Sequence, residues 1–285
     1  MAHCLTPEAE AILDKEFPVL DKGFIRLVDY LGGDERVVQS ARVSYGKGTK
    51  SYREDAALID YLLRHSHTSP FEQVVLTFHV KLPIFIARQW IRHRTARMNE
   101  ISGRYSVMKD DFYIPAADDV ALQSADNKQG RSSETPDPAL IEKIRAAFAE
   151  GQKSAYTDYS SIVEQGIARE LARINLPLSL YTEWYWQIDL HNLFHFLELR
   201  LDAHAQKEIR LYAQVLLAIA KKVAPRCCES FEQHVLGGVR FSGNELAELR
   251  KRLGENGQDS TDGPAALSGK ALERFEEKLK TGRQL

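Results

Sequence analysis

The sequence predicts an α/β (α+β) protein with a central, largely antiparallel sheet flanked by helices. Two segments of alternating polarity, 74–82 and 180–188, indicate half-buried strands, because successive side chains of a strand point to opposite faces. Apolar residues recur at helical spacing over 53–65, 139–171 and 205–223. At 285 residues, with 44% hydrophobic and 27% charged positions, the chain can bury one large core.

The first half of the chain alternates strand and helix signals. Gly32 and Gly33 end the first strand, and Asp34 is a residue type that caps helices. In chain order, the predicted elements are a strand at 24–30, a helix capped by Asp34, a helix at 53–65, a loop with His65 and His67, the strand at 74–82, a helix from Pro83 to about His93, and a loop at 94–106.

The second half is mainly helical around one strand. In chain order, we expect a solvent loop at 116–138, a helical segment at 139–171 broken near Gly166, the strand at 180–188, a helix from 189–192 to about Leu201, a helix at 205–223 stopped by Pro225, a flexible linker at 254–264, and a short charged helix at the C-terminal end.

Charge and cysteine content exclude several classes of protein. The formal net charge is −2, which argues against general affinity for nucleic acids or acidic membranes. The chain has no run of about 20 apolar residues and no signal-peptide pattern at its start. Cys4, Cys227 and Cys228 form no CxxC pair, so neither a disulfide framework nor a metal site is expected. We expect a cytoplasmic protein.

Residues 92–106 concentrate cations and hydroxyls. Arginine presents a planar fork of donors that matches phosphate oxygens, and Gly103 allows close approach of a ligand to the main chain. Asn99 and Glu100 add acceptors suited to a base, a ribose or a flavin edge. The mixture favours a phosphorylated small molecule as ligand.

Other interpretations of this segment stay open at this point. It could be a solvated charged surface, which is the usual meaning of a charge run. It could also form an RNA-binding module, or a module for another phosphorylated ligand, because basic residues interleave with Trp90. Ser102 could be a nucleophile, but no base lies at a fixed spacing from it.

His191 and His195 lie four residues apart on one predicted helix. This is the spacing of a two-histidine metal site, but the intervening residues lack the glutamate of HExxH. His195 stands in the apolar run LFHFLEL, so a core histidine or a cofactor contact is favoured over a metal ligand. No metal is predicted.

Arg92-His93-Arg94, seven further residues and then Ser102 resemble the RHRx7S signature of the flavin-dependent thymidylate synthases (ThyX family). Further segments resemble the family in the same order, over about residues 22–235: Ala41 to Tyr45, His67 to Glu72, Leu199-Arg200 and Asp202 to Gln206. On this basis we expect an N-terminal extension at 1–22, a catalytic domain at 23–240, and a linker with a charged helical tail at 241–285.

The resemblance implies a reaction and its partners. It implies the thymidylate synthase-complementing protein fold, and a homotetramer whose active sites are shared between subunits. The family converts dUMP to dTMP, with 5,10-methylenetetrahydrofolate as carbon donor and FADH2, regenerated by NADPH, as hydride donor. Neither a nucleic acid nor a membrane is an expected partner.

The resemblance also implies roles for individual residues. Arg200 matches the residue that activates uracil, since a nearby positive charge lowers the pKa of N3. This sequence departs from the family at Arg97, where a serine is usual, and at Asp189-Leu190-His191, where Asn-x-Arg is frequent. The implied dUMP contacts are Gln89, Arg92, Glu100, Ser102, Gly103, Arg104, Arg173 and Arg200; the FAD contacts are Ser69, Arg92, His93, Arg94, Thr95, Glu100, Asp189, His191 and His195; and further possible contacts are Ser44, His67, Asn99 and Tyr105.

Overall fold

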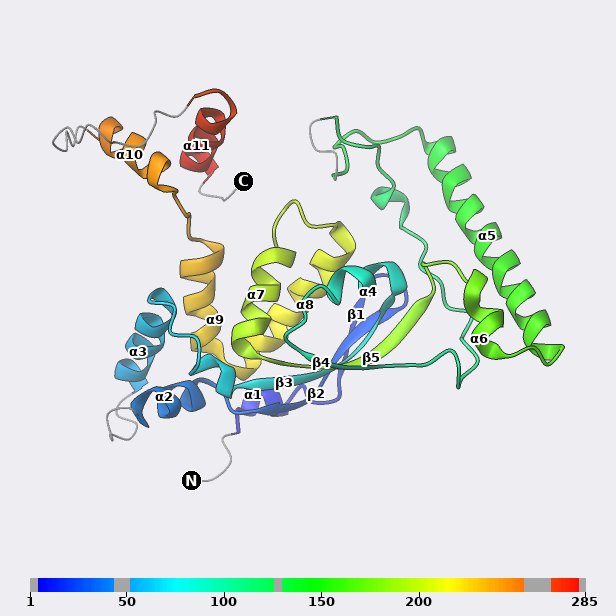
Figure 1. Ribbon diagram of the computed structural model, residues 1–285, viewed down its shortest axis with the longest axis horizontal. Coiled ribbons are helices and arrows are strands. Elements are labelled where there is room, and N and C mark those ends of the chain that lie inside the picture. Colours follow the sequence, from blue (N-terminus) through cyan, green and yellow to red (C-terminus); the bar gives the residue numbers. More distant parts are fainter. Residues whose placement is uncertain (1–4, 44–51, 126–129, 254–267, 282–285) are drawn as a thin grey trace. The chain divides into compact units, whose positions relative to one another are not determined.

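The computed structural model describes residues 5–43, 52–125, 130–253 and 268–281, which divide into two compact units. The first unit, Met1–Cys228, contains the sheet (Figure 1). The second unit is Glu229–Leu285. Within the described residues, no helix combines the length and apolar character that crossing a bilayer requires.

One five-stranded sheet lies at the centre of the first unit, and every pairing in it is antiparallel. This confirms the predicted fold class. The two long strands predicted from the alternation of polarity are neighbours in the sheet. Phe78 lies opposite Trp186. In spatial order, the strands are β1 (Glu16–Val19), β2 (Gly23–Leu31), β3 (Val75–Pro83), β5 (Tyr181–Asp189) and β4 (Arg97–Glu100).

Helices cover one face of the sheet and form the main core with it. Trp90 is fully buried there, with its ring 5.0 Å from that of Trp186 and 4.7 Å from that of Phe196. Aromatic side chains bury large apolar areas, so this cluster holds helices and sheet together. The helices are α4 (Ile84–Trp90), α7 (Leu190–Arg200) and α8 (Lys207–Val223).

Two short strands were missed by the sequence analysis. β1 contains Pro18 and lies at the sheet edge, where proline is tolerated because its missing N–H is not needed by a neighbour. β4 lies within the segment 94–106 that was predicted as loop, and all four of its side chains are exposed. β4 carries no buried-exposed alternation, and the alternation of β1 extends over only four residues, one of which is proline.

Asp34 does not cap the helix that was predicted to start there. Helix α2 (Asp34–Arg42) has Gly33 at its N-cap position, and the Asp34 carboxylate instead accepts from the main-chain N–H groups of Arg226, at 2.9 Å, and Cys227, at 3.0 Å. These belong to the first turn of α9 (Pro225–Phe231), whose free N–H groups need acceptors. Helix α3 (Tyr52–Arg64) confirms the prediction for 53–65.

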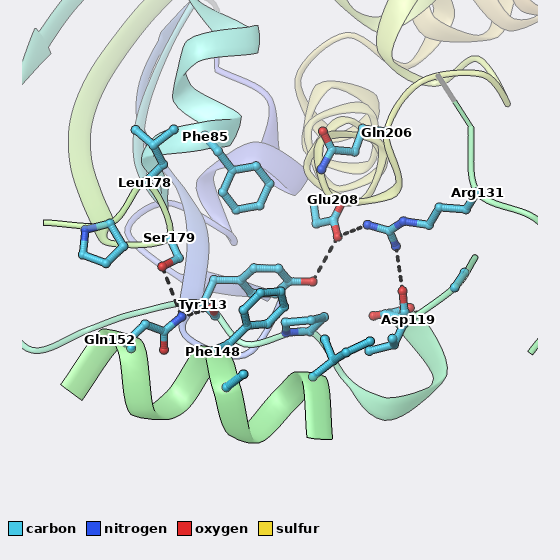
Figure 2. Close-up of a pocket in the computed structure, with 17 residues that line it drawn as sticks. Phe85, Tyr113, Asp119, Arg131, Phe148, Gln152, Leu178, Ser179, Gln206 and Glu208 are labelled. Carbon is cyan, nitrogen blue, oxygen red and sulfur yellow. Dashed lines mark hydrogen bonds and ion pairs between the residues drawn. The ribbon is translucent and has the colours of Figure 1, made fainter. Parts of the chain in front are cut away.

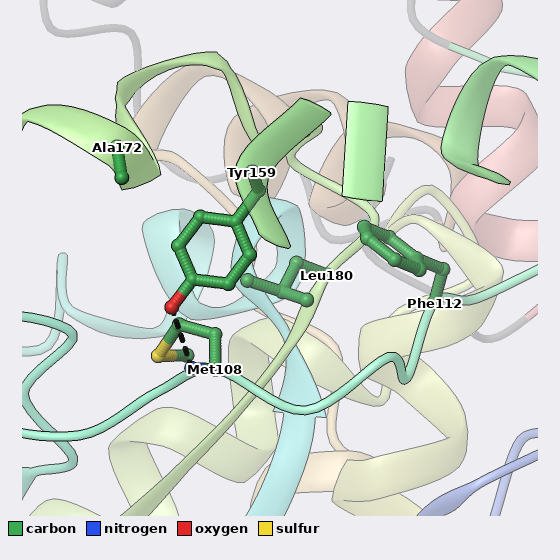
Figure 3. Packing of buried hydrophobic residues seen from close by; sticks show 5 residues of the cluster. All are labelled: Met108, Phe112, Tyr159, Ala172 and Leu180. Carbon is green, nitrogen blue, oxygen red and sulfur yellow. Dashed lines mark hydrogen bonds between the residues drawn. The ribbon is translucent and has the colours of Figure 1, made fainter. Parts of the chain in front are cut away.

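A second, smaller core attaches α5 (Pro138–Glu164) to the start of β5 (Figure 3). Tyr159 lies at its centre, and its hydroxyl accepts from the main-chain N–H of Met108 at 2.9 Å. Helix α6 (Arg169–Ala172) and the 3-10 helix η4 (Arg173–Asn175) follow α5 after the break predicted near Gly166. Ala172 belongs to the same core, so this core also fixes the position of Arg173.

The segment 116–138 is more than the predicted solvent loop. It contains the 3-10 helix η3 (Ala117–Asp119), and Arg131 pairs with the buried Glu208 of α8 at 2.5 Å. A buried carboxylate needs a cation or donors, which explains why this polar tract is held against the protein.

The described part of the second unit contains three further helical elements. Their bounds are η5 (Glu232–Leu236, a π-helix), α10 (Gly243–Arg252) and α11 (Gly269–Thr281). Ser242 and Glu245 form a capping box at the start of α10, and Glu245 pairs with Lys278 of α11 at 2.7 Å. The predicted linker at 254–264 lies outside the described residues. The division into domains at 1–22, 23–240 and 241–285 stays a prediction.

Candidate active site

Arg200, at the C-terminal end of α7, is held by two acceptors. Its Nε donates to Nε2 of His93 at 3.1 Å, and its Nη2 donates to the main-chain oxygen of Gln89 at 3.3 Å. The side chain is half-buried, and this burial lowers the pKa of Arg200. Two fixed hydrogen bonds orient the guanidinium plane before any ligand arrives.

His93 must be neutral to accept from Arg200. A guanidinium only donates, so Nε2 of His93 carries the lone pair and the ring proton lies on Nδ1. The pKa of His93 is lowered from 6.5 to about 4, mainly by burial and then by the neighbouring Arg200 and His195. The ring is therefore an acceptor for Arg200 at neutral pH.

A cavity of about 280 Å³ opens beside this pair, and we call it the Arg200 pocket. The apolar part of its wall comes from Ile188 and Leu199. Neither Arg92 nor Arg94 has a carboxylate partner among the described residues, so both can engage an anion. Six residues singled out in the sequence line the pocket together: Arg92, His93, Arg94, Thr95, His195 and Arg200.

The end of α4 explains how the arginine-rich segment reaches this pocket. The helix was predicted to run to about His93, but it ends at Trp90, whose side chain is buried under α7 and α8. The chain then turns and continues into β4, which pairs with β5. Residues 92–95 consequently lie in the turn, next to α7.

A second group of predicted residues gathers in the loop after β4, which we call the Ser102 loop (residues 101–106). The main-chain N–H of Arg104 donates to Oγ of Ser102 at 3.3 Å, and Nε of Arg104 pairs with Glu170 at 3.0 Å. A Cβ atom placed on Gly103 would lie 3.0 Å from Cδ of Arg173. Arg173 therefore belongs to this second group.

The two groups are separated along β5. Ile188 lines the Arg200 pocket, whereas the main-chain oxygen of Glu183 accepts from Ile101 of the Ser102 loop at 2.9 Å. Five strand residues span about 17 Å at the usual rise of a strand. Glu100 lies on the Ser102 side, where its carboxylate accepts from Thr182 at 2.6 Å. Asn99 is exposed on β4, opposite Tyr185.

The predicted cofactor contacts on and before α7 lie in different surroundings. Asp189 is the N-cap of the helix, and its carboxylate accepts from the main chain of Asn192 at 2.9 Å and from its side chain at 2.7 Å. His195 is exposed in the Arg200 pocket, so it is not a core histidine. His191 is partly exposed and does not line that pocket. The described residues contain no cluster of three metal-ligating side chains.

The remaining predicted contacts lie elsewhere or cannot be placed. His67 and Ser69 are exposed after α3, and the ring of His67 lies 6.0 Å from that of Tyr61. Tyr105 is exposed in the Ser102 loop, and its main-chain oxygen accepts from Arg169 at 2.8 Å. Ser44 lies outside the described residues.

The structure adds two residues that the sequence analysis did not single out. Gln206 accepts a hydrogen bond from the side-chain amide of Gln89. Glu208 is 2% exposed and accepts from Arg131 and Tyr113 (Figure 2). Both residues also border a larger cavity of about 620 Å³ that none of the predicted site residues lines. Gln206 ends the family segment 202–206, which was the available signal; nothing local marks Glu208.

The RNA-binding interpretation loses its main support in the structure. Stacking of bases needs accessible aromatic faces, but Trp90 is completely buried in the core.

Comparisons with known proteins agree on one family. Residues 26–226 match the family described as thymidylate synthase complementing protein, and residues 239–285 match the thymidylate synthase ThyX C-terminal domain. A flavin-dependent thymidylate synthase from Treponema denticola is 66% identical over 273 residues, covering 96% of this chain and 100% of the relative. One from Treponema pallidum is 60% identical over 284 residues, covering 100% of this chain and 91% of the relative.

A solved structure has a similar fold. It is the UMP/dUMP methylase PolB from Streptomyces cacaoi bound with 5-Br dUMP, with a TM-score of 0.68 at 31% sequence identity. The similarity covers 77% of this chain and 98% of PolB.

Proposed function

The chain belongs to the thymidylate synthase complementing protein family, and from that premise we propose how its residues support the reductive methylation of dUMP to dTMP. The enzyme is a flavin-dependent thymidylate synthase that uses FAD, with 5,10-methylenetetrahydrofolate as carbon donor and NADPH as reductant. When bound, the reduced flavin supplies the hydride that completes the methyl group.

The fixed guanidinium of Arg200 carries this proposal. Placed beside the uracil ring, it stabilises negative charge and lowers the pKa of N3, which makes C5 more electron-rich. His93 and the main chain of Gln89 already hold it in one orientation, so little reorganisation is needed on binding. Arg200 is therefore the proposed catalytic residue.

The donor set of the Arg200 pocket fits part of FAD. Arg92, Arg94 and Thr95 offer donors for anionic or carbonyl oxygens, and His195 offers a ring nitrogen. At about 280 Å³, the pocket is at the small end of ligand sites, so one subunit's pocket supplies only part of the surface that FAD needs. The FAD roles of Ser69, Asp189 and His191 stay predictions.

The Ser102 loop is the proposed site of the dUMP phosphate. Ser102 offers a hydroxyl, Gly103 an unobstructed main chain, and Arg104 and Arg173 two guanidinium groups. In the free subunit Arg104 is engaged by Glu170 in an exposed ion pair, which a doubly charged phosphate can replace at little cost.

The separation of the two groups supports a site that is shared between subunits. The Arg200 pocket includes Ile188, near one end of β5, whereas Glu100 and the Ser102 loop lie near the other end, beside Thr182 and Glu183. One nucleotide contacts all of them if the Arg200 pocket of one subunit faces the Ser102 loop of the next. We propose the homotetramer as the assembly that achieves this, in the cytoplasm, where the buried thiols of Cys227 and Cys228 stay reduced.

The experiment for this proposal combines a spectrum with an assay. The purified chain should show flavin absorbance and should release tritium from C5-labelled dUMP when methylenetetrahydrofolate and NADPH are present. A colourless protein that stays inactive after addition of FAD would contradict the proposal.

A further inference from the structure

A series of contacts, the first of them to the main chain of Gln89, leads from Arg200 to the start of α8. Nη2 of Arg200 donates to the main-chain oxygen of Gln89, and Nε2 of Gln89 donates to Oε1 of Gln206. The amide of Gln206 in turn lies beside the carboxylate of Glu208. The reaction described above assigns no role to either Gln206 or Glu208.

Glu208 is an ionised carboxylate although it is 2% exposed. Burial raises its pKa, but the hydrogen bond from Arg131, at 2.5 Å, and the Gln206 amide lower it, and the net shift is downward. Tyr113 donates to the same oxygen as Arg131, at 3.1 Å (Figure 2). An ionised carboxylate can only accept hydrogen bonds.

This acceptor determines how the two neighbouring amides are oriented. A glutamine amide has a donor end and an acceptor end of almost the same shape, and its neighbours decide which end points where. In Figure 2 the NH2 end of Gln206 lies on the side of the Glu208 carboxylate, whose negative charge favours that orientation, and Oε1 of Gln206 accepts from Gln89. Gln89 must then turn its own NH2 group toward Gln206. The side-chain oxygen of Gln89 has no hydrogen-bond partner among the described residues, so it can accept from a ligand.

We propose that Glu208 and Gln206 are positioning residues that fix the Gln89 amide with its oxygen toward the bound base, so that the site selects a pyrimidine with N–H at N3. This inference rests on the proposed function, which places dUMP beside Gln89 and Arg200. Uracil carries a hydrogen at N3, whereas cytosine has a lone pair there that the Gln89 oxygen repels. Recognition of the neutral base precedes its ionisation, for which Arg200 supplies the positive charge.

The test measures dissociation constants of dUMP and dCMP with the full-length, flavin-loaded enzyme. In Glu208→Gln the carboxylate becomes an amide that can also donate. In Gln206→Leu the acceptor for Gln89 is removed. The side-chain amide of Gln89 can therefore flip in both variants. We expect the preference for dUMP over dCMP to fall about tenfold, as expected when one buried hydrogen bond is mismatched. The second variant keeps the test valid if Glu208→Gln does not fold.

Two control variants distinguish a changed orientation of the Gln89 amide from a general disturbance of the structure. Tyr113→Phe removes one hydrogen bond from the same carboxylate but leaves Arg131 and Gln206 in place. Glu142→Gln makes the same carboxylate-to-amide change in a surface pair with Arg145, at 3.3 Å. Both controls should keep the full preference for dUMP.

The outcomes distinguish this inference from the proposed function. If the wild-type enzyme forms dTMP and prefers dUMP, but Glu208→Gln and Gln206→Leu weaken both nucleotides equally or not at all, the positioning role is wrong and the function stands. If the wild-type protein binds neither nucleotide and forms no dTMP, the proposed function itself is wrong.

Discussion

Nε of Arg200 donates to Nε2 of His93 across 3.1 Å, so the cation proposed to activate uracil is held by a histidine that must stay neutral. The two residues are 107 positions apart in the chain, one at the end of α7 and the other in the turn after α4. Their hydrogen bond orients the guanidinium group. It also requires the imidazole proton to lie on Nδ1 of His93. Both properties lead to measurable consequences.

Arg200→Lys should fold and bind flavin but turn over slowly. Lysine keeps the charge but lacks the planar fork that contacts His93 and Gln89 together, so the position of the charge beside uracil is lost. We expect kcat to fall about 100-fold, which is typical of losing one group that stabilises developing charge. Tritium release from C5-labelled dUMP measures it; an unchanged kcat would contradict the role of Arg200.

The neutral state of His93 predicts how stability depends on pH. Its pKa is lowered from 6.5 to about 4, first by burial and then by Arg200 and His195. Between these values the unfolded chain binds a proton that the folded chain does not, so the free energy of unfolding should decrease as the pH falls through this window. Urea denaturation at several pH values measures the decrease.

His93→Gln provides the control for that measurement, because its side-chain oxygen can accept from Arg200 but does not titrate. We expect a smaller loss of stability between pH 6.5 and pH 4 in this variant. Equal losses in the two proteins would show that His93 is not responsible.

Arg131→Ala should destabilise the enzyme, because it leaves the carboxylate of Glu208 buried without its cation. Removing one partner of a buried pair costs about 3–5 kcal/mol, and because the Arg131 side chain is 36% exposed we expect about 2 kcal/mol here. In Arg64→Ala, which breaks a surface pair with Asp60, the expected loss is about 0.3 kcal/mol. Urea denaturation of both variants measures the difference, and similar losses would contradict the buried pair.

Gly103→Ala should weaken dUMP binding. The new Cβ would lie 3.0 Å from Arg173 and 3.2 Å from Met108, so Arg173 must shift away from the Ser102 loop. We expect KM for dUMP to rise about fivefold, which corresponds to weakening one hydrogen bond by about 1 kcal/mol. Steady-state kinetics measures this.

The matched control is Gly151→Ala on α5, where a Cβ meets nothing within 4 Å. There we expect an unchanged KM and a gain of about 0.5–1 kcal/mol in stability, because alanine favours the helix. A normal KM in Gly103→Ala would contradict the proposed phosphate site.

Much of the fold follows from local patterns in the sequence. The alternation at 74–82 and 180–188 identified β3 and β5 because one face of each strand is buried. β4 could not be found in this way, since its side chains are all exposed and its pairing is determined by β5. Asp34 was assigned to the wrong helix, because the N–H groups it caps lie 192 and 193 residues away.

The residues of the candidate site could be predicted from the sequence, but their positions relative to one another could not. The segment from Arg92 to Ser106 indicated a phosphorylated ligand, and the family resemblance supplied the individual roles. The division of these residues between the two ends of β5 depends on the pairing of β4, which the sequence did not reveal. Glu208 was missed because its burial and its partner Arg131 are consequences of the tertiary fold.

The most direct test of the shared site mixes two inactive variants. Arg200→Ala lacks the activating group and Arg104→Ala lacks a phosphate contact, so each alone should form little dTMP. If every site takes Arg200 from one subunit and Arg104 from another, co-assembled chains should recover about a quarter of wild-type activity, because about a quarter of the sites receive both intact residues. No recovery in mixed assemblies would show that both residues act within one chain and would contradict this account.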